Sequence, residues 1–285
     1  MYLIERNSCP LCGNQKFNYL YKISYNETDI KNFLLNYYNN KLNLNLILNS
    51  DYELLECNKC SFIFQKNIPN DRFSQHLYEN IISANESFEK KNNLDKYKKK
   101  YEFEISLINS IFKKKNINVL EFGAGWGFWA KNAKENGINV DVFEVSRERI
   151  KFMEENHLNV VHDLTNINKT YDLIYSDQTI EHLNNPYDLF NSTLPILSQN
   201  GYLLINYPST FMFKRKLKKN YKPKKDAAHP LEHLNLFNRS SFEFIAKKYN
   251  LELINFKCKY HLTFKAIIKD IKNFFYFDSI LLKKN

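Results

Sequence analysis

The sequence of 285 residues is short of glycine, of acidic side chains and of long apolar runs. No stretch approaches the roughly 20 apolar residues that a membrane-spanning helix needs. The first ten residues, MYLIERNSCP, lack the charged, apolar and small-residue sections that follow one another in a secretory signal. These absences predict a cytoplasmic protein without a transmembrane segment, and a hydrophobic content of 44% suffices for a sizeable core.

Acidic residues are outnumbered by basic ones. The chain has 31 Asp and Glu and 41 Lys and Arg, which gives a formal net charge of +10. This excess favours an anionic partner, such as a nucleotide-linked or phosphorylated substrate, a nucleic acid or an acidic membrane surface. The charge alone does not separate these partners. Lysine, asparagine, isoleucine and tyrosine are over-used along the whole chain, as an AT-rich genome would produce without selection for binding.

Glycine is scarce, with six in the chain, yet Gly123, Gly125 and Gly127 fall within five positions of the segment VLEFGAGWGF. The residues before them are apolar like a strand, and GFWAKNAKENG after them has helical periodicity and ends at Gly137. A strand, a glycine turn and a helix favour a nucleotide site, because glycines let the backbone approach a ligand and a helix N-terminus offers free N–H groups. The order Glu121-x-Gly-x-Gly-x-Gly differs from the G-x-G-x-x-G spacing of a dinucleotide site.

Four of the five cysteines form two Cys-x2-Cys pairs, in CPLCG and CNKC. In a reducing compartment disulfides are disfavoured, and two such pairs supply the four thiolates of a tetrahedral zinc site. Four protein ligands leave no open position, so we expect a structural zinc that does no chemistry. The alternative is two unrelated pairs of buried cysteines. The predicted zinc ligands are Cys9, Cys12, Cys57 and Cys60.

Two further stretches have recognisable periodicity. Between the cysteine pairs, residues 13–56 are expected to form a substantial insertion, in which KLNLNLIL alternates like a strand and DYELLECNKCSFIF predicts strand, knuckle, strand. Residues 94–115 predict an amphipathic helix whose lysines lie on a solvated face rather than on a nucleic-acid stripe. The apolar face of this helix comprises Leu94, Tyr97, Tyr101, Ile105, Ile108 and Phe112.

The glycine spacing resembles motif I of the class I S-adenosylmethionine-dependent methyltransferases, and further segments resemble that family in order along residues 90–260. The resemblance implies an α/β, Rossmann-like fold, in which helices flank a seven-stranded sheet, and S-adenosylmethionine as cofactor. Glu144, at the end of the second strand, would accept hydrogen bonds from the ribose hydroxyls, and Asp163 would lie beside the adenine. The cofactor residues so implied are Glu121, Gly123, Gly125, Gly127, Glu144, Asp163 and Asp177.

The loop after the fourth strand, in YDLIYSDQTIEHLNNP, could also hold a divalent ion, as some relatives do through Glu-x2-Glu-His. Gln178 stands at the first Glu position and is a poor ligand for a hard cation, which disfavours such a site. Asp177, next to it, keeps the possibility open together with Glu181 and His182. Three aromatic residues near the glycines are expected to pack beneath the turn rather than to contact a ligand, namely Trp126, Phe128 and Trp129.

The N-terminal cysteine pairs, joined through helices to such a core, resemble the zinc-containing methyltransferases that act on sugar nucleotides and related glycan precursors. Their Glu-His pair corresponds to Glu232 and His233 in HPLEHL. The resemblance implies His233 as the base that removes the acceptor proton, Glu232 as its orienting group and His182 as a second candidate, with His229 a weaker one. Carbon-methylating members usually carry a further C-terminal domain, so we expect O- or N-methylation of a small polar acceptor that is anionic or nucleotide-linked.

This organisation predicts a zinc-binding module at 1–70, a helical linker at 71–115 and a methyltransferase domain at 116–285. Two other functions stay open: an RNA methyltransferase, although the fourth strand lacks Asn/Asp-Pro-Pro-Tyr, and a cofactor-binding protein without activity. The basic segment 214–225, KRKLKKNYKPKK, is interpreted as a lid over a phosphorylated substrate or as a solvated loop. Residues 264–284 are interpreted as the last strand with a docked helix, or as an amphipathic segment that touches a membrane.

Overall fold

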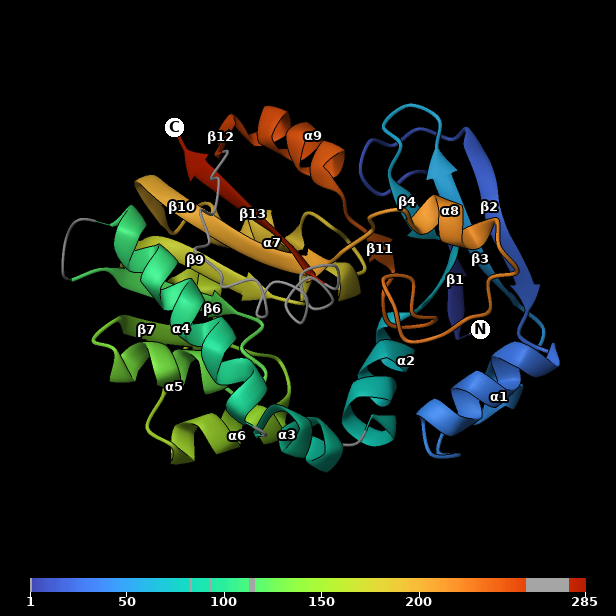
Figure 1. The fold of residues 1–285 in the computed structure, drawn as a ribbon, viewed down its shortest axis with the longest axis horizontal. Coiled ribbons are helices and arrows are strands. Elements are labelled where there is room, and N and C mark those ends of the chain that lie inside the picture. The colour runs from blue at the N-terminus through green and yellow to red at the C-terminus, as the bar shows by residue number, and fades with distance from the viewer. Residues whose placement is uncertain (1, 83, 93, 113–115, 255–276) are drawn as a thin grey trace, which may run out of the picture.

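The structure is a computed structural model, and it describes residues 2–82, 84–92, 94–112, 116–254 and 277–285. A seven-stranded sheet forms the core of the larger part of the chain, and a four-stranded and a two-stranded sheet lie in the N-terminal part beside it (Figure 1). No helix in the described ranges has the length and apolar character that crossing a membrane requires.

The large sheet has the strand order β12-β13-β10-β9-β6-β7-β8, in which β13 is antiparallel to both neighbours and the other pairings are parallel. This is the mostly parallel, Rossmann-like sheet that the resemblance implies, so that prediction is confirmed. The order reverses between β6 and β9, and open sheets of this kind bind ligands at the carboxyl ends of the strands beside such a reversal. The strands are β6 (Asn118–Phe122), β7 (Asn139–Phe143), β8 (Asn159–Val160), β9 (Tyr171–Asp177), β10 (Leu197–Pro208), β12 (Leu251–Ile254) and β13 (Phe277–Lys284).

Helices cover both faces of this sheet (Figure 1). One apolar cluster joins α4 and α5 to the sheet and includes Tyr101, Ile105 and Ile108, which the three- and four-residue spacing places on one face. A second cluster joins α7 and α9 to the opposite face. The helices are α4 (Leu94–Ile111), α5 (Phe128–Glu135), α6 (Arg147–Glu155), α7 (Asp188–Thr193) and α9 (Arg239–Tyr249).

The four-stranded sheet has the order β11-β4-β3-β2, and its edge strand β11 comes from the far end of the chain. The predicted strand, knuckle and strand around the second cysteine pair are confirmed as β3 and β4. The remaining elements of this part include the helices α1 to α3 and a turn of π-helix, η2. Their bounds are β1 (Leu3–Glu5), β2 (Phe17–Ser24), α1 (Thr28–Tyr37), β3 (Asp51–Cys57), β4 (Ile63–Gln65), β5 (Asn67–Pro69), α2 (Asp71–His76), η2 (Leu77–Ile81), α3 (Ala84–Asn92) and β11 (Asn235–Leu236).

The strand predicted in KLNLNLIL is wrong, because this stretch contains a 3-10 turn, η1 (Leu44–Leu46). The side chain of Asn43 accepts a hydrogen bond from the N–H of Asn45 at 3.1 Å. Such a local side-chain bond competes with an extended backbone and favours a turn. Leu42 and Ile47 are nonetheless buried, in the cluster that packs against α1.

At the C-terminal end, the expected last strand is β13, and Ile280, Leu281 and Leu282 are buried where it lies between β10 and β12. The strand therefore stands at the end of the segment rather than before a docked helix. Most of the segment 264–284, up to residue 276, lies outside the described residues.

Candidate functional site

The glycine turn joins β6 to α5 and holds three glycines in the left-handed region, with φ of +74° at Gly123, +58° at Gly125 and +69° at Gly127. A Cβ on Gly123 would lie 2.4 Å from the Oγ1 of Thr179, and one on Gly127 would lie 2.5 Å from a methyl carbon of Leu158. A Cβ on Gly125 would meet nothing within 4 Å. The first and last glycines therefore allow close packing, and the middle one borders open space.

Two carboxylates are bound to the main chain around this turn. Glu144, just after β7, accepts hydrogen bonds from the N–H of Gly125 at 2.8 Å and from those of Val145 and Ser146 at 2.8 and 3.0 Å. Glu121, on β6, accepts from the N–H of Ala130 in α5 at 3.1 Å. The structure thus brings together the glycines and two of the predicted cofactor carboxylates, and it fixes the orientation of both.

Asp177, at the end of β9, lies in a pocket with the glycine turn and pairs with Lys100 of α4, whose Nζ is 2.7 Å from its Oδ1. Lys100 is 24% exposed, so the expectation that the lysines of this helix lie on a solvated face is wrong for this one. Lys100 lies inside the site because of the way α4 docks on the sheet. Helical periodicity identifies the apolar face of α4, but it does not determine the orientation of the helix on the sheet. The residues that line the pocket are Tyr101, Glu121, Gly123, Ala124, Trp126, Phe128, Trp129 and Asp177.

A buried polar network extends from this pair under the carboxyl end of the sheet. Glu104 accepts hydrogen bonds from the hydroxyl of Tyr175 at 2.8 Å and from the side-chain amide of Asn206 at 2.7 Å. Burial raises the pKa of Glu104 to about 7, and the nearby charge of Lys100 opposes part of this rise. No sequence pattern marks this network, because its members come from three separate elements.

The other expected residues of this region serve different purposes. Trp129 stacks on Tyr175 with ring centroids 3.8 Å apart, and Trp126 packs on Phe152 at 5.3 Å, so both rings are packing residues. Asp163 is exposed, and its carboxylate accepts hydrogen bonds from the N–H and hydroxyl of the nearby Thr165 at 2.8 and 2.7 Å.

A cluster of histidines lies where the loop after β9 meets the HPLEHL segment. The rings of His182 and His233 are 4.9 Å apart, and those of His233 and His229 are 5.6 Å apart. Nδ1 of His182 lies 2.9 Å from the hydroxyl of Tyr78 and 2.9 Å from the main-chain oxygen of Glu232. The structure therefore brings together His182, Glu232 and His233, which were predicted from two separate segments of the sequence. It also adds Tyr78 to the cluster.

Burial changes the pKa of two histidines in this cluster. His229 is fully buried, and its Nδ1 lies 3.7 Å from a carboxylate oxygen of Glu232, whose other oxygen accepts from the hydroxyl of Tyr38 at 2.9 Å. Burial lowers the pKa of His229 and of His233 well below the ordinary 6.5, with neighbouring positive groups adding to the effect. Both rings are therefore neutral near pH 7, and each keeps a nitrogen lone pair.

The N-terminal part of the chain holds the HPLEHL segment in place. The side-chain amide of Gln65 on β4 donates to the main-chain oxygens of His229 at 2.9 Å and His233 at 3.0 Å. The hydroxyl of Tyr52 on β3 donates to the main-chain oxygen of Ala228, and β11 pairs with β4 directly after the segment. These anchors could not be found from the sequence, because they join residues far apart in the chain.

The basic segment 214–225 also faces the N-terminal part. Lys214 pairs with Glu56 on β3, Lys222 pairs with Asp29 on α1 at 3.0 Å, and Nζ of Lys225 lies 3.1 Å from the hydroxyl of a tyrosine at the end of α1. The charges of Lys214 and Lys222 are therefore matched by carboxylates within the chain, whereas Lys225 meets a neutral hydroxyl. The segment is thus neither a purely solvated loop nor a wholly unpaired basic surface.

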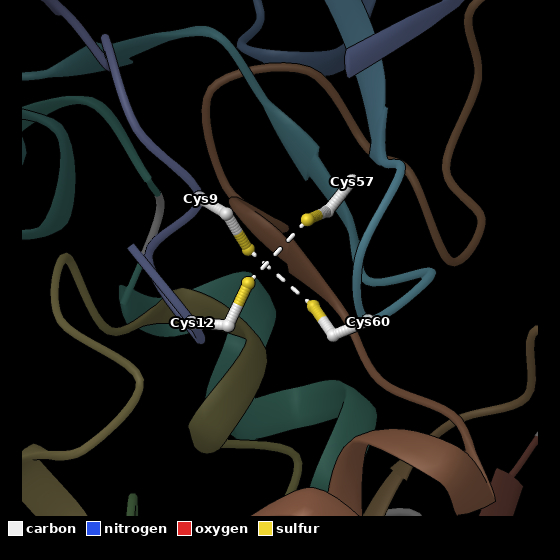
Figure 2. Close-up of side chains that lie close together, drawn as sticks. All are labelled: Cys9, Cys12, Cys57 and Cys60. Atoms are coloured by element: carbon white, nitrogen blue, oxygen red, sulfur yellow. Dashed lines mark hydrogen bonds between the residues drawn. The ribbon is translucent and has the colours of Figure 1, made fainter. Parts of the chain in front are cut away.

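The four predicted zinc ligands form one cluster whose sulfurs point toward a common centre (Figure 2). The Sγ atoms are 3.6 Å apart between Cys9 and Cys60 and 3.4 Å apart between Cys12 and Cys57. A disulfide would need about 2.05 Å, whereas Zn–S bonds of about 2.3 Å in a tetrahedron separate the sulfurs by roughly 3.8 Å. The cluster therefore fits a tetrahedral ion and not a disulfide.

Comparison with known proteins identifies the core. The family model described as a methyltransferase domain matches residues 94–255. Similar solved structures include the plantazolicin methyltransferase BpumL in complex with SAH, with a TM-score of 0.55, 15% identity and coverage of 74% of this chain and 93% of that one. Another is the plantazolicin methyltransferase BamL with a triazolic desmethylPZN analog and SAH, with a TM-score of 0.54, 13% identity and coverage of 74% and 94%. No curated protein matches the chain.

Proposed function

Since this chain belongs to the methyltransferase-domain family and is an S-adenosylmethionine-dependent methyltransferase, we propose that it methylates an oxygen or nitrogen of a small polar acceptor. The observation that carries this proposal is the cluster of histidines and carboxylates beside the glycine turn. Thr179, two residues before the start of that cluster, lies against Gly123, with its Oγ1 3.5 Å from the glycine oxygen. A methyl donor at the turn and an acceptor at the cluster would therefore be neighbours.

We assign cofactor binding to the turn and its carboxylates. Glu144 is the proposed partner of the ribose hydroxyls, because its main-chain bonds orient it while its oxygens can accept further hydrogen bonds. Glu121, Gly123, Gly127 and Asp177 complete this site, and Asp163 is proposed to lie beside the adenine. The bound cofactor supplies a methyl group activated by the sulfonium, so these residues need only to bind it and align it.

The acceptor is proposed to bind at His182, Glu232 and His233. Transfer to a hydroxyl breaks an O–H bond, so its proton must leave, and the sequence resemblance gives that task to His233. Its lowered pKa makes the ring a weak proton acceptor, whereas its lone pair remains available. Removal of the acceptor proton would then depend on two further contributions. The protein aligns the acceptor oxygen, and a group other than His233 weakens its O–H bond.

Among acceptors we favour a sugar nucleotide, a glycan precursor or a phosphorylated metabolite, in line with the net positive charge of the chain. The RNA alternative receives less support, because lysines of the basic segment pair with Glu56 and Asp29. We also propose that a structural zinc binds the cysteine cluster and, through β4 and Gln65, fixes the acceptor segment.

The acceptor class is tested with purified protein, S-adenosylmethionine and a panel that contains sugar nucleotides, sugar phosphates, small amines and a folded RNA. We expect release of S-adenosylhomocysteine, and a product heavier by one methylene group, with a member of the small-molecule set. The Glu144→Ala variant serves as the blank for contaminating activity. Methylation of RNA alone would refute the proposed acceptor class.

A further inference from the structure

We propose that Glu181, His182 and His233 bind a divalent transition-metal ion beside the methyl-transfer site. One potential ligand atom from each residue lies within 4.8 Å of the other two, and Nε2 of His182 is 3.9 Å from Oε1 of Glu181. Two imidazoles and one carboxylate form a ligand set that zinc and non-haem iron use when they keep a coordination position open. This site is separate from the cysteine cluster.

The tautomer of His182 suits this role. Its Nδ1 lies 2.9 Å from the main-chain oxygen of Glu232, which can only accept a hydrogen bond, so Nδ1 carries the proton. The neutral ring then has its lone pair on Nε2, the nitrogen nearer to Glu181. Metal-binding histidines are commonly oriented in this way, by donating their second ring N–H to a carbonyl or carboxylate.

His233 presents a matching nitrogen from the opposite segment. Its Nδ1 is buried and has no hydrogen-bond partner among the described residues. A buried polar atom without a partner is costly, and an ion between these side chains would satisfy it.

The separations favour an ion over a direct hydrogen bond. The distance of 3.9 Å between Nε2 of His182 and Oε1 of Glu181 exceeds the roughly 3.2 Å limit of a good N–H···O bond. A tetrahedral ion with bonds of about 2.0–2.1 Å separates its ligand atoms by roughly 3.4 Å, so small side-chain movements would complete the site. Two nitrogen ligands favour zinc, iron or cobalt over magnesium and calcium, which prefer oxygen.

The catalytic role of the ion rests on the proposed function, whereas its binding does not. An acceptor hydroxyl on the open position would lose its proton to water more readily, because the ion lowers its pKa. The oxygen then attacks the methyl carbon, the S–CH3 bond breaks, and the sulfur keeps the electron pair as S-adenosylhomocysteine forms.

The test is a titration of the full chain with Co2+, after dialysis has left one zinc per chain in the cysteine cluster. Calorimetry and visible absorption should show one further ion bound by the wild-type protein. Glu181→Gln and His233→Asn each remove one ligand and should weaken Co2+ binding by about 100-fold or more. His162→Asn is the matched control, because this histidine is exposed and pairs with Glu154, and it should bind Co2+ like the wild type.

Each variant is first checked for zinc content and S-adenosylmethionine affinity, and His182→Asn replaces any variant that fails this check. Wild-type protein that takes up no second ion would overturn the inference, as would ligand variants that bind Co2+ normally. Full turnover of a wild-type sample free of the second ion would also overturn it while leaving the proposed function intact. Tight Co2+ binding that depends on these ligands, without methylation of any small acceptor, would support the ion site and count against the proposed function.

Discussion

We expect a substitution of Gln65, which lies outside the glycine turn, to alter the proposed acceptor site. Its side chain is fully buried, and its amide nitrogen donates to the main-chain oxygens of His229 and His233 at 2.9 and 3.0 Å. Gln65→Met preserves the approximate volume but removes both donors. The main-chain oxygen of His233 would lose its donor and the N–H of Leu231 its acceptor, whereas the oxygen of His229 keeps the N–H of His233 at 3.0 Å. Each buried group left without a partner costs about 1–3 kcal/mol, so we expect the free energy of unfolding to fall by about 2–5 kcal/mol.

The measurement is equilibrium unfolding in denaturant, together with turnover and cofactor affinity. Turnover should fall because the HPLEHL segment loses its anchor, whereas the affinity for S-adenosylmethionine should stay within about two-fold, because the glycine turn belongs to another element. Gln75→Met, at an exposed glutamine on α2, is the matched control and should change stability by less than about 0.5 kcal/mol. A loss below about 1 kcal/mol with normal turnover of the Gln65 variant would refute the reasoning.

Four further outcomes are expected. Glu144→Ala should weaken S-adenosylmethionine binding about ten- to a hundred-fold by calorimetry, and unchanged affinity would place the ribose elsewhere. Gly125→Ala should abolish cofactor binding while Gly137→Ala should not, although both positions have positive φ and open space and should lose a similar stability of about 1 kcal/mol. Cys57→Ser should remove the structural zinc and lower the melting temperature, and metal analysis that finds zinc retained would contradict this. The pKa of Glu104 is higher in the folded chain, about 7, than its ordinary 4.5, so the folded chain binds more protons between these values. Stability should therefore fall as pH rises through that window, and Glu104→Gln should remove this part of the pH dependence.

Local spacing was enough to predict the glycine turn and the cysteine cluster. Gly123, Gly125 and Gly127 are needed for a backbone conformation that depends on near neighbours, and the two Cys-x2-Cys pairs each form one local knuckle. The seven-stranded, Rossmann-like sheet followed from the resemblance, and the structure confirms it. In contrast, KLNLNLIL was misread, because the side-chain bond from Asn43 stabilises a turn that an alternation pattern does not register.

The acceptor side was predicted less completely, because it depends on contacts between distant segments. His182 and His233 could each be named from a local Glu-His pair, but their proximity follows only from the docking of two loops. Tyr78 reaches this cluster from η2, and Lys100 reaches Asp177 from α4. An amphipathic pattern shows that a helix docks, and it does not show which polar residue at the margin of its apolar face meets a partner.

Contacts between the N-terminal part and the large sheet bear on how this enzyme selects its acceptor. The cysteine cluster shares an apolar core with the large sheet, and β11 completes the four-stranded sheet directly after the acceptor segment. Contacts therefore cross the boundary that the sequence suggests near residue 70. Because the turn proposed to bind the cofactor joins β6 to α5, while the segment proposed to bind the acceptor is held by β3 and β4, we expect the two binding events to depend on different parts of the chain. Changes in the N-terminal part should then alter the choice and turnover of acceptor, with little effect on the affinity for the methyl donor.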